Sequence, residues 1–190
     1  MSSSSSDNEE SILIQSFTDT EVEEYTVSLT FTNNTSPQIM DIIDYINRRL
    51  VRSNIDYPIF LEIILSKLCK LTDSKFGCLL MKEENSFKWI VSEDKYNIFE
   101  KENKDLKQLQ NIINYSFIEN KAIISNNISK DPRIEKDFTE QISSIIIIPV
   151  KGKWCFVFAR LIDSKNYSTD EIENLLPIIR IVNRILKLAF

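Results

Sequence analysis

The sequence predicts an α+β domain built on a central antiparallel sheet. Apolar segments of strand length come in pairs joined by short polar turns, as in 76–81 with 86–91 and 142–150 with 154–162. Amphipathic helical segments bracket those pairs, which favours helices packed on a sheet of hairpins. With 190 residues, 43% hydrophobic and 27% charged, the chain can form one ordinary globular core.

The first 56 residues divide into a tail and an extension. Residues 1–11, MSSSSSDNEES, are acidic and nearly free of apolar side chains, so they predict a disordered tail. Residues 12–56 predict a strand, from the apolar alternation of Tyr25–Phe31, and an amphipathic helix from 37 to 53. Ser36 before Pro37 is a helix-start signal.

Residues 57–190 contain the predicted main domain. A second amphipathic helix begins after Asp56, a candidate N-cap, and carries apolar residues at 61, 64, 65, 68 and 71. A third helix surrounds 109–117, a short apolar element lies at 122–125, and Asp131-Pro132 predicts a turn. The last helix is expected from about Ser168. Thr169-x-x-Ile172 does not complete a capping box, whereas Asp170 and Glu171 suit the start of a helix.

The run Ile145–Ile148 predicts a central strand. Four consecutive isoleucines, in place of alternation, indicate a strand that is covered on both faces. The apolar run ends at Val150 and is far too short to cross a bilayer. Pro149 and the lysines at 151 and 153 limit its tendency to aggregate.

Composition excludes several kinds of function. The chain has no histidine, which removes histidine acid–base catalysis, Ser-His or Cys-His nucleophiles and histidine zinc sites. Its two glycines form no phosphate-binding loop, and its net charge of −5 shows no basic stripe for nucleic acid. Cys69, Cys78 and Cys155 lie in apolar segments and predict buried free thiols. No catalytic or metal-binding residue is therefore assigned.

The amino terminus lacks a basic segment and an apolar core, so it does not predict a signal peptide, and we expect an intracellular, cytoplasmic protein without membrane or nucleic-acid partners. Isoleucine, asparagine and lysine are abundant, as AT-rich coding produces in some protists, bacteria and large DNA viruses. A viral source would allow a place in the virion.

Several motifs in the second half resemble the GAF domain family. Asn127-Ile128 with Asp131-Pro132-Arg133 is similar to the family's segment before its lid. Ser144 to Pro149-Val150 is similar to a family strand, and Tyr167-Ser168 with Glu171 to the entry of the last helix. The stretch 57–81 is similar to the family's opening helix and first strand, so the resemblance covers roughly 57–190.

The resemblance implies a GAF/PAS-like sheet of about six antiparallel strands, with helices on one face and a lid on the other. In many members the lid encloses a small-molecule pocket, and other members serve as dimerisation modules. By resemblance, the pocket residues are those of the sheet wall and of the lid between Asn126 and Phe138: Trp89, Asn126, Arg133, Phe138, Ile147, Phe156 and Phe158. Arg133 could bind an anionic ligand or hold the lid through Asp131, Glu135 or Asp137.

The family's best-known ligands fit this chain poorly. Cyclic-nucleotide-binding members carry Asn-Lys…Phe-x3-Asp-Glu, whereas Asp170-Glu171 follows Tyr167 one residue too soon and no Asn-Lys precedes it. Bilin-binding members need a suitably placed cysteine and usually histidine. The expected function is a non-enzymatic sensory module with an unidentified small-molecule ligand and unknown cofactor. The alternatives are a structural or interaction protein that has lost the ligand and, more weakly, a cysteine-dependent redox enzyme.

The terminal helix predicts an association surface. One apolar stripe runs from Ile172 to Ala189, and a second stripe beside it consists of Ile178, Ile181, Ile185 and Leu188. A helix that is apolar over so much of its circumference needs two packing partners. The sheet can cover one stripe, and the helix at 37–53 or a second subunit in a homodimer could cover the other.

Overall fold

The computed structural model describes residues 11–17, 22–28, 36–51, 55–84, 86–94, 104–134, 141–150 and 152–189, with side chains from Ser36 onward except at 104–108 and 188–189. In chain order the elements are β1 Ser11–Phe17, β2 Val22–Ser28, α1 Pro37–Leu50, α2 Tyr57–Leu71, β3 Phe76–Lys82, β4 Phe87–Asp94, α3 Lys104–Glu119, β5 Lys121–Ser125, β6 Ile142–Val150, β7 Trp154–Leu161 and α4 Thr169–Ala189. The predicted helices and strands from residue 37 onward are confirmed, and residues 1–10 of the predicted tail lie outside the described residues.

The strands form one sheet in the order β2-β1-β5-β6-β7-β3-β4. Its five strands from β5 to β4 pair antiparallel throughout, which confirms the predicted α+β class. The sheet has seven strands where about six were expected, and β1 pairs parallel to β5. A parallel pair needs a long crossover, and most of the chain separates these two strands.

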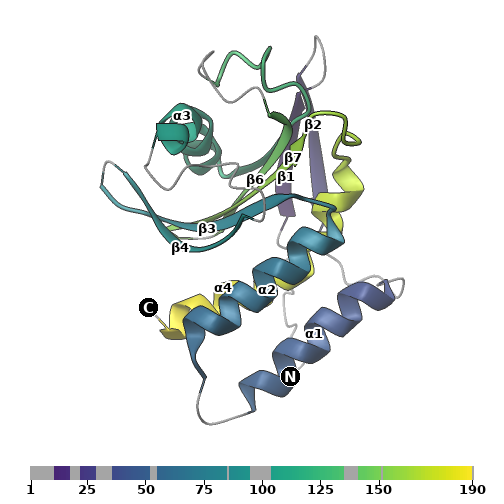
Figure 1. Ribbon diagram of the computed structural model, residues 1–190, viewed down its shortest axis with the longest axis vertical. Helices are drawn as coiled ribbons and strands as arrows, with labels where there is room; N and C mark the ends of the chain where they lie inside the picture. The colour runs from purple at the N-terminus through teal and green to yellow at the C-terminus, as the bar shows by residue number, and fades with distance from the viewer. Residues whose placement is uncertain are drawn as a thin grey trace, which may run out of the picture.

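The helices lie on both faces of the sheet, in unequal number. Figure 1 shows α2 and α4 against one face, with α1 packed outside them, and α3 on the opposite face. We call these the helical face and the inner face. The prediction placed all helices on one face and the lid alone on the other. The structure differs at one point, because α3 lies on the same face as the lid segment. Leu109, Ile112 and Ile113 turn the apolar side of α3 toward the sheet.

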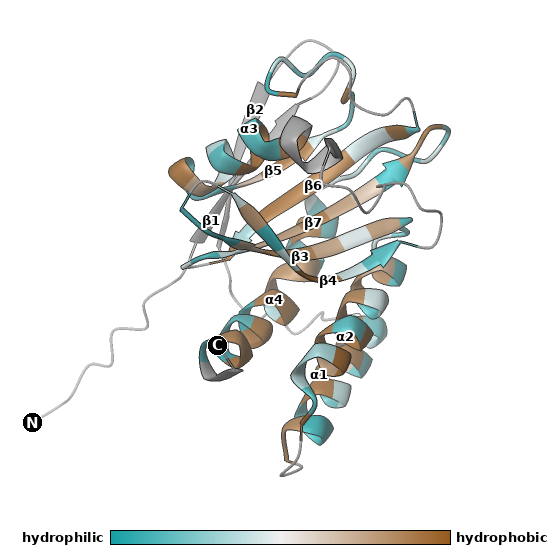
Figure 2. Ribbon diagram, turned by 60° about the vertical axis from the view of Figure 1, so that its left-hand side comes forward, coloured by the Kyte–Doolittle hydropathy of each residue, from teal (hydrophilic) through white to brown (hydrophobic). Residues whose placement is uncertain are grey.

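Strand β6 is the middle strand and separates two hydrophobic cores. Ile146 and Ile148 pack on the helical face, while Ile145 and Ile147 pack on the inner face. All four side chains are fully buried, so the prediction of a strand covered on both faces is confirmed. In Figure 2 β6 and β7 are coloured as hydrophobic over much of their length. Each buried isoleucine stabilises the fold by about 1.5–3 kcal/mol.

Side-chain caps begin the long helices. Ser36 Oγ accepts the Ile39 N–H at 3.4 Å, and Asp56 Oδ1 accepts the Ile59 N–H at 3.3 Å, as predicted. The expectation for α4 concerned Thr169-x-x-Ile172, and the frame one residue earlier supplies half of a capping box. Ser168 precedes α4, and its N–H donates to a Glu171 carboxylate oxygen at 2.9 Å. No described helix is long and apolar enough to span a membrane.

Candidate functional site

The candidate site is the layer between the inner face and the segment 126–134, which we call the lid segment. The inner face presents side chains of four strands: Phe76, Cys78, Leu80, Ile123, Ile145, Ile147, Cys155, Val157 and Ala159. Helix α3 and the lid residues Ile128 and Ile134 pack over this surface. None of the nine side chains is more than 1% exposed. A ligand-sized void against them would leave accessible surface, so the described centre of the layer is a dry, filled core.

The structure corrects the predicted pocket wall. Ile147 lies on the inner face, but Phe156 and Phe158 lie on the helical face, where their rings stack 6.1 Å apart. Because strand side chains alternate, β7 instead turns Cys155, Val157 and Ala159 toward the lid segment. The sheet therefore separates the two phenylalanines from any ligand held by the lid.

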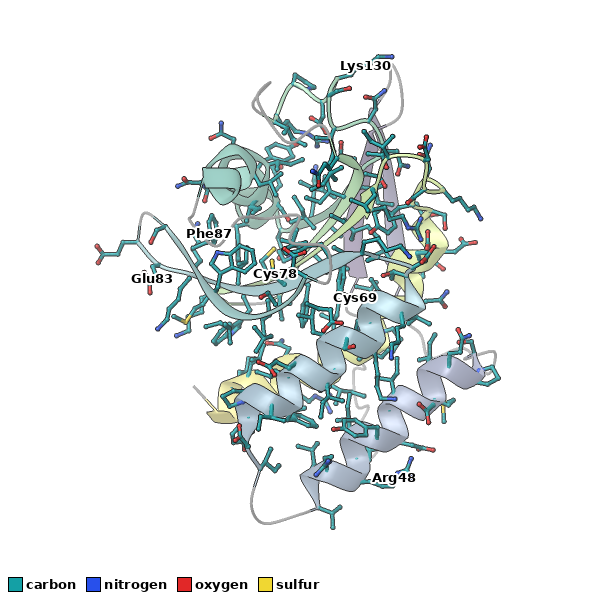
Figure 3. All side chains as sticks on the ribbon, in the orientation of Figure 1. Arg48, Cys69, Cys78, Glu83, Phe87 and Lys130 are labelled. Carbon is teal, nitrogen blue, oxygen red and sulfur yellow. The ribbon has the colours of Figure 1, made fainter. Side chains whose placement is uncertain are left out.

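Trp89 lies on the inner side at the edge strand β4, in an aromatic cluster. Its ring meets Phe76 edge-on at 5.8 Å, and beside them Phe87 of β4 stacks on Phe117 of α3, also at 5.8 Å. Trp89, Phe87 and Phe117 are each half-buried. Figure 3 labels Phe87 on the side of the hairpin that faces α3. This aromatic cluster (Phe76, Phe87, Trp89 and Phe117) supplies partly accessible apolar surface beside the closed inner core.

A short ion pair holds the described lid segment. Arg133 donates to both carboxylate oxygens of Asp131, from Nε at 2.8 Å and from Nη2 at 2.6 Å, and its own N–H also reaches Asp131 Oδ1 at 3.0 Å. The guanidinium lies 5.7 Å from the ring centroid of Tyr115 on α3. Asp131 is buried, so this bidentate pair satisfies a carboxylate that would otherwise be costly to desolvate. Arg133 was expected either to bind an anionic ligand or to hold the lid through an acidic neighbour. These contacts correspond to the second role, with Asp131 as the neighbour.

Asn126 ties the start of the lid segment to the chain before α4. Its Nδ2 donates to the Tyr167 carbonyl at 2.9 Å, and its Oδ1 accepts the Tyr167 N–H at 2.8 Å. The Asn126 side-chain amide therefore bonds both backbone groups of Tyr167, a residue 41 positions later in the chain. Phe138, the remaining predicted lid residue, lies outside the described residues. Whether Trp89, Asn126, Arg133 and Ile147 contact a ligand stays a prediction.

The sequence interpretation missed a buried polar network around Arg160. This side chain, on β7, donates to the carbonyls of Thr72, Lys165 and Asn166 and pairs with Glu171. Tyr167 Oη and Thr72 Oγ1 each lie 2.6 Å from Ser74 Oγ in the same network. A single arginine inside the apolar run WCFVFARLI was the available signal, because a cation in a buried strand requires partners. The network joins α2, β7 and α4 and has a structural role.

The three cysteines are buried thiols, as predicted. Cys69 belongs to the helical-face core and Cys78 to the inner face, on opposite sides of β3 in Figure 3. Burial raises the pKa of Cys78 and of Cys155, so both thiols stay protonated at neutral pH. Within the described residues no group of three or more Cys, Asp or Glu side chains could hold a metal ion.

The second apolar stripe of α4 packs against the core of the same molecule. Ile178 and Ile185 are buried in the helical-face core, and Ile181 is half-buried against it. Helix α1 packs on α4, and its buried residues share one core with this stripe, which favours coverage by the helix at 37–53. The side chain of Leu188 lies outside the described residues. A dimer through these residues stays a prediction, and it would require α1 to move.

Comparisons with known proteins show the fold. No protein-family model matches the chain, and no curated protein matches its sequence. Solved structures do match. The GAF domain of a phosphoenolpyruvate-protein phosphotransferase from Coxiella burnetii has a TM-score of 0.63 at 13% identity, covering 81% of this chain and 96% of that one. The nlh2 GAF domain of A. aeolicus has a TM-score of 0.57 at 16% identity, covering 80% and 98%.

A third similar structure is an enzyme. The type II free methionine-R-sulfoxide reductase of Thermoplasma acidophilum has a TM-score of 0.52 at 12% identity, covering 64% of this chain and 86% of that one. At these identities the likeness establishes the architecture alone, because one fold serves many activities. The chain has a divergent GAF-like fold, as its motifs predict.

Proposed function

We propose that this GAF-like chain is a non-enzymatic regulatory module that acts by association with a second molecule of protein. GAF domains of known structure are typically sensory or regulatory, which supports a regulatory role. The closed inner layer is the observation that favours association with a protein over binding of a small molecule. Its nine sheet side chains have almost no accessible surface, and Ile128 and Ile134 of the lid segment pack over them.

The cysteines support a non-enzymatic role. A thiolate nucleophile needs a lowered pKa and access to its substrate. In this chain Cys78 and Cys155 are fully buried, and burial raises the pKa of both thiols. This chain therefore shares the fold of the sulfoxide reductase, but its Cys78 and Cys155 lack both features of a reactive thiol.

The exposed apolar residues of α1 and α2 offer a surface for association. Leu50, Val51 and Ile59 gather where the two helices connect, and Val51 is 88% exposed. Met40 adds exposed apolar surface on α1. Apolar side chains so exposed are costly in water and favour burial against a partner. This surface needs no movement of α1, in contrast to the second stripe of α4.

A second candidate is a small-molecule sensor, and the aromatic cluster favours it. Half-buried Trp89, Phe87 and Phe117 stand at the edge of the inner layer, where a flat apolar ligand could stack without displacing the buried isoleucines.

Native mass spectrometry of the purified full-length chain distinguishes the two. Association predicts a dimer, or a complex with a captured partner, that carries no small molecule. Val51→Asp should weaken the complex at least tenfold, while Ile162→Asp, at an exposed position after β7, should leave it unchanged. A monomer at micromolar concentration without a partner would overturn the proposal. A bound small molecule at one per chain that is lost in Trp89→Ala would establish the sensor instead.

A further inference from the structure

Helices α1 and α2 enclose a groove on the opposite side of the molecule from the lid segment. The two helices run antiparallel side by side in Figure 1, so the first half of α1 faces the second half of α2. Between them lies a groove of about 420 Å³. Small-molecule sites in proteins occupy roughly 300–1,000 Å³. The groove is therefore large enough for a small organic ligand.

The walls of the groove are apolar at the bottom and charged at the rim. Pro37, Ile42 and Leu71 contribute the apolar surface, and Ile42 belongs to the helical-face core. Lys67 and Lys70 of α2 line the same groove, as does Asp41 of α1. Residues three apart on a helix lie on the same side, so both lysines belong to the side of α2 that lines the groove.

One of the two lysines is already held in place. Lys67 Nζ lies 3.0 Å from Asp41 Oδ2 and 5.4 Å from the ring centroid of Tyr45. Lys70 is exposed. Two lysines and one aspartate leave these lining groups with a net charge of +1. The start of α1 contributes little, because Ser36 already accepts the Ile39 N–H there.

We propose that this groove binds a small amphipathic anion, an aliphatic carboxylate. Its apolar chain lies over Pro37, Ile42 and Leu71, and its carboxylate lies between the ammonium groups of Lys67 and Lys70. The lysines attract the anionic group, and Asp41 neutralises only one of them. Burial of the ligand's hydrocarbon chain against the apolar wall is favourable, because it removes apolar surface from water. The site does not depend on the proposed association or on the lid segment.

Decanoate tests the site, with decanol as an uncharged probe that has the same apolar chain. Amide resonances of the full-length protein are followed by NMR during titration with each. We expect decanoate to shift the resonances of Gln38, Asp41, Lys67, Lys70 and Leu71, and decanol to bind at least fivefold more weakly. Lys70→Glu should weaken decanoate binding at least fivefold and leave decanol binding unchanged.

Lys88→Glu is the matched control. It makes the same change in net charge at an exposed lysine of β4 that does not line the groove. Equal weakening by Lys88→Glu would overturn the proposal, because the effect would then be one of overall charge. Decanol binding as tightly as decanoate, or decanoate shifts centred on the aromatic cluster, would overturn it as well.

Discussion

The guanidinium of Arg160 lies over the ring of Tyr167, with 3.9 Å between its Cζ and the ring centroid, and both side chains are buried. Arg160 comes from the end of β7 and Tyr167 from the connection to α4. The same guanidinium satisfies carbonyl groups on two connections, before β3 and before α4. The contact therefore fixes how α4 leaves the sheet.

Arg160→Met should destabilise the fold by about 3 kcal/mol, because it leaves Glu171 and several carbonyl groups without their charged donor. Urea unfolding followed by circular dichroism measures this change. Arg184→Met is the control, at an exposed position of α4, and should change stability by less than about 0.5 kcal/mol. Similar stability of the two variants would show that the network is energetically unimportant.

Gly77→Ala should destabilise the protein by about 1–3 kcal/mol through overpacking. A Cβ at this position would overlap the Sγ of Cys69 and lie 3.3 Å from the Phe158 ring. Because the overlap is with one sulfur atom, Cys69→Ala should rescue part of the loss. A double-mutant cycle of unfolding free energies measures the coupling, and strictly additive effects would contradict this contact.

The three thiols should not react with Ellman's reagent in the native protein at pH 8, and all three should react in guanidinium chloride. Burial excludes the reagent, and it also keeps Cys78 and Cys155 protonated by raising the pKa of each. Absorbance at 412 nm reports the number that reacts. Rapid native labelling of any one thiol would reopen the cysteine-dependent redox alternative.

Stability should fall as the pH rises above about 9, where the thiols of Cys78 and Cys155 ionise first in the unfolded chain, and more steeply above about 10. Burial raises the pKa of Tyr167 above its ordinary value of 10.0, so the unfolded chain loses this proton first. The contribution is fully present below pH 10 and declines above it. Unfolding free energies between pH 8 and pH 11 measure the slope. Tyr167→Phe, which cannot ionise, should show a smaller slope than the wild-type chain, and an unchanged slope would refute the assignment to Tyr167.

Arg133→Gln should loosen the lid segment without unfolding the domain, because Asp131 loses its bidentate partner. Hydrogen exchange of residues 127–134 should accelerate at least tenfold, while exchange in β6 stays unchanged. Lys130→Gln is the control in the same segment, at an exposed position. Equal acceleration in both variants would mean that the pair does not hold the segment.

Local patterns predicted the elements and some of their ends. Alternation and helical spacing located the helices and strands from residue 37 onward, and the cap residues Ser36 and Asp56 took the roles expected of them. Strand β1 was not predicted, and β2 lies at Val22–Ser28 where a strand was expected at 25–31. The start of α4 shows the limit of such reasoning. The sequence interpretation compared Thr169 with Ile172 and therefore missed the hydrogen bond from the Ser168 N–H to the Glu171 carboxylate. Boundaries of this kind depend on tertiary contacts, here with Arg160.

The candidate site was predictable only in part. The motif around Asp131-Pro132-Arg133 indicated a lid, and Asp131 was among the expected partners of Arg133. Phe156 and Phe158 were assigned to the wrong face of the sheet. Alternation states that neighbours on β7 point in opposite directions, but it does not say which set faces the lid segment.

By itself the sequence determined the α+β class, the order of the elements from residue 37 onward and the double coverage of β6, because each depends on local periodicity and side-chain chemistry. The tertiary structure decided what covers each apolar surface: α1 packs on α4, and the lid segment with α3 packs over the inner face. Apolar burial is not directional, so an apolar stripe requires a cover without specifying it. That choice depends on how the whole chain packs.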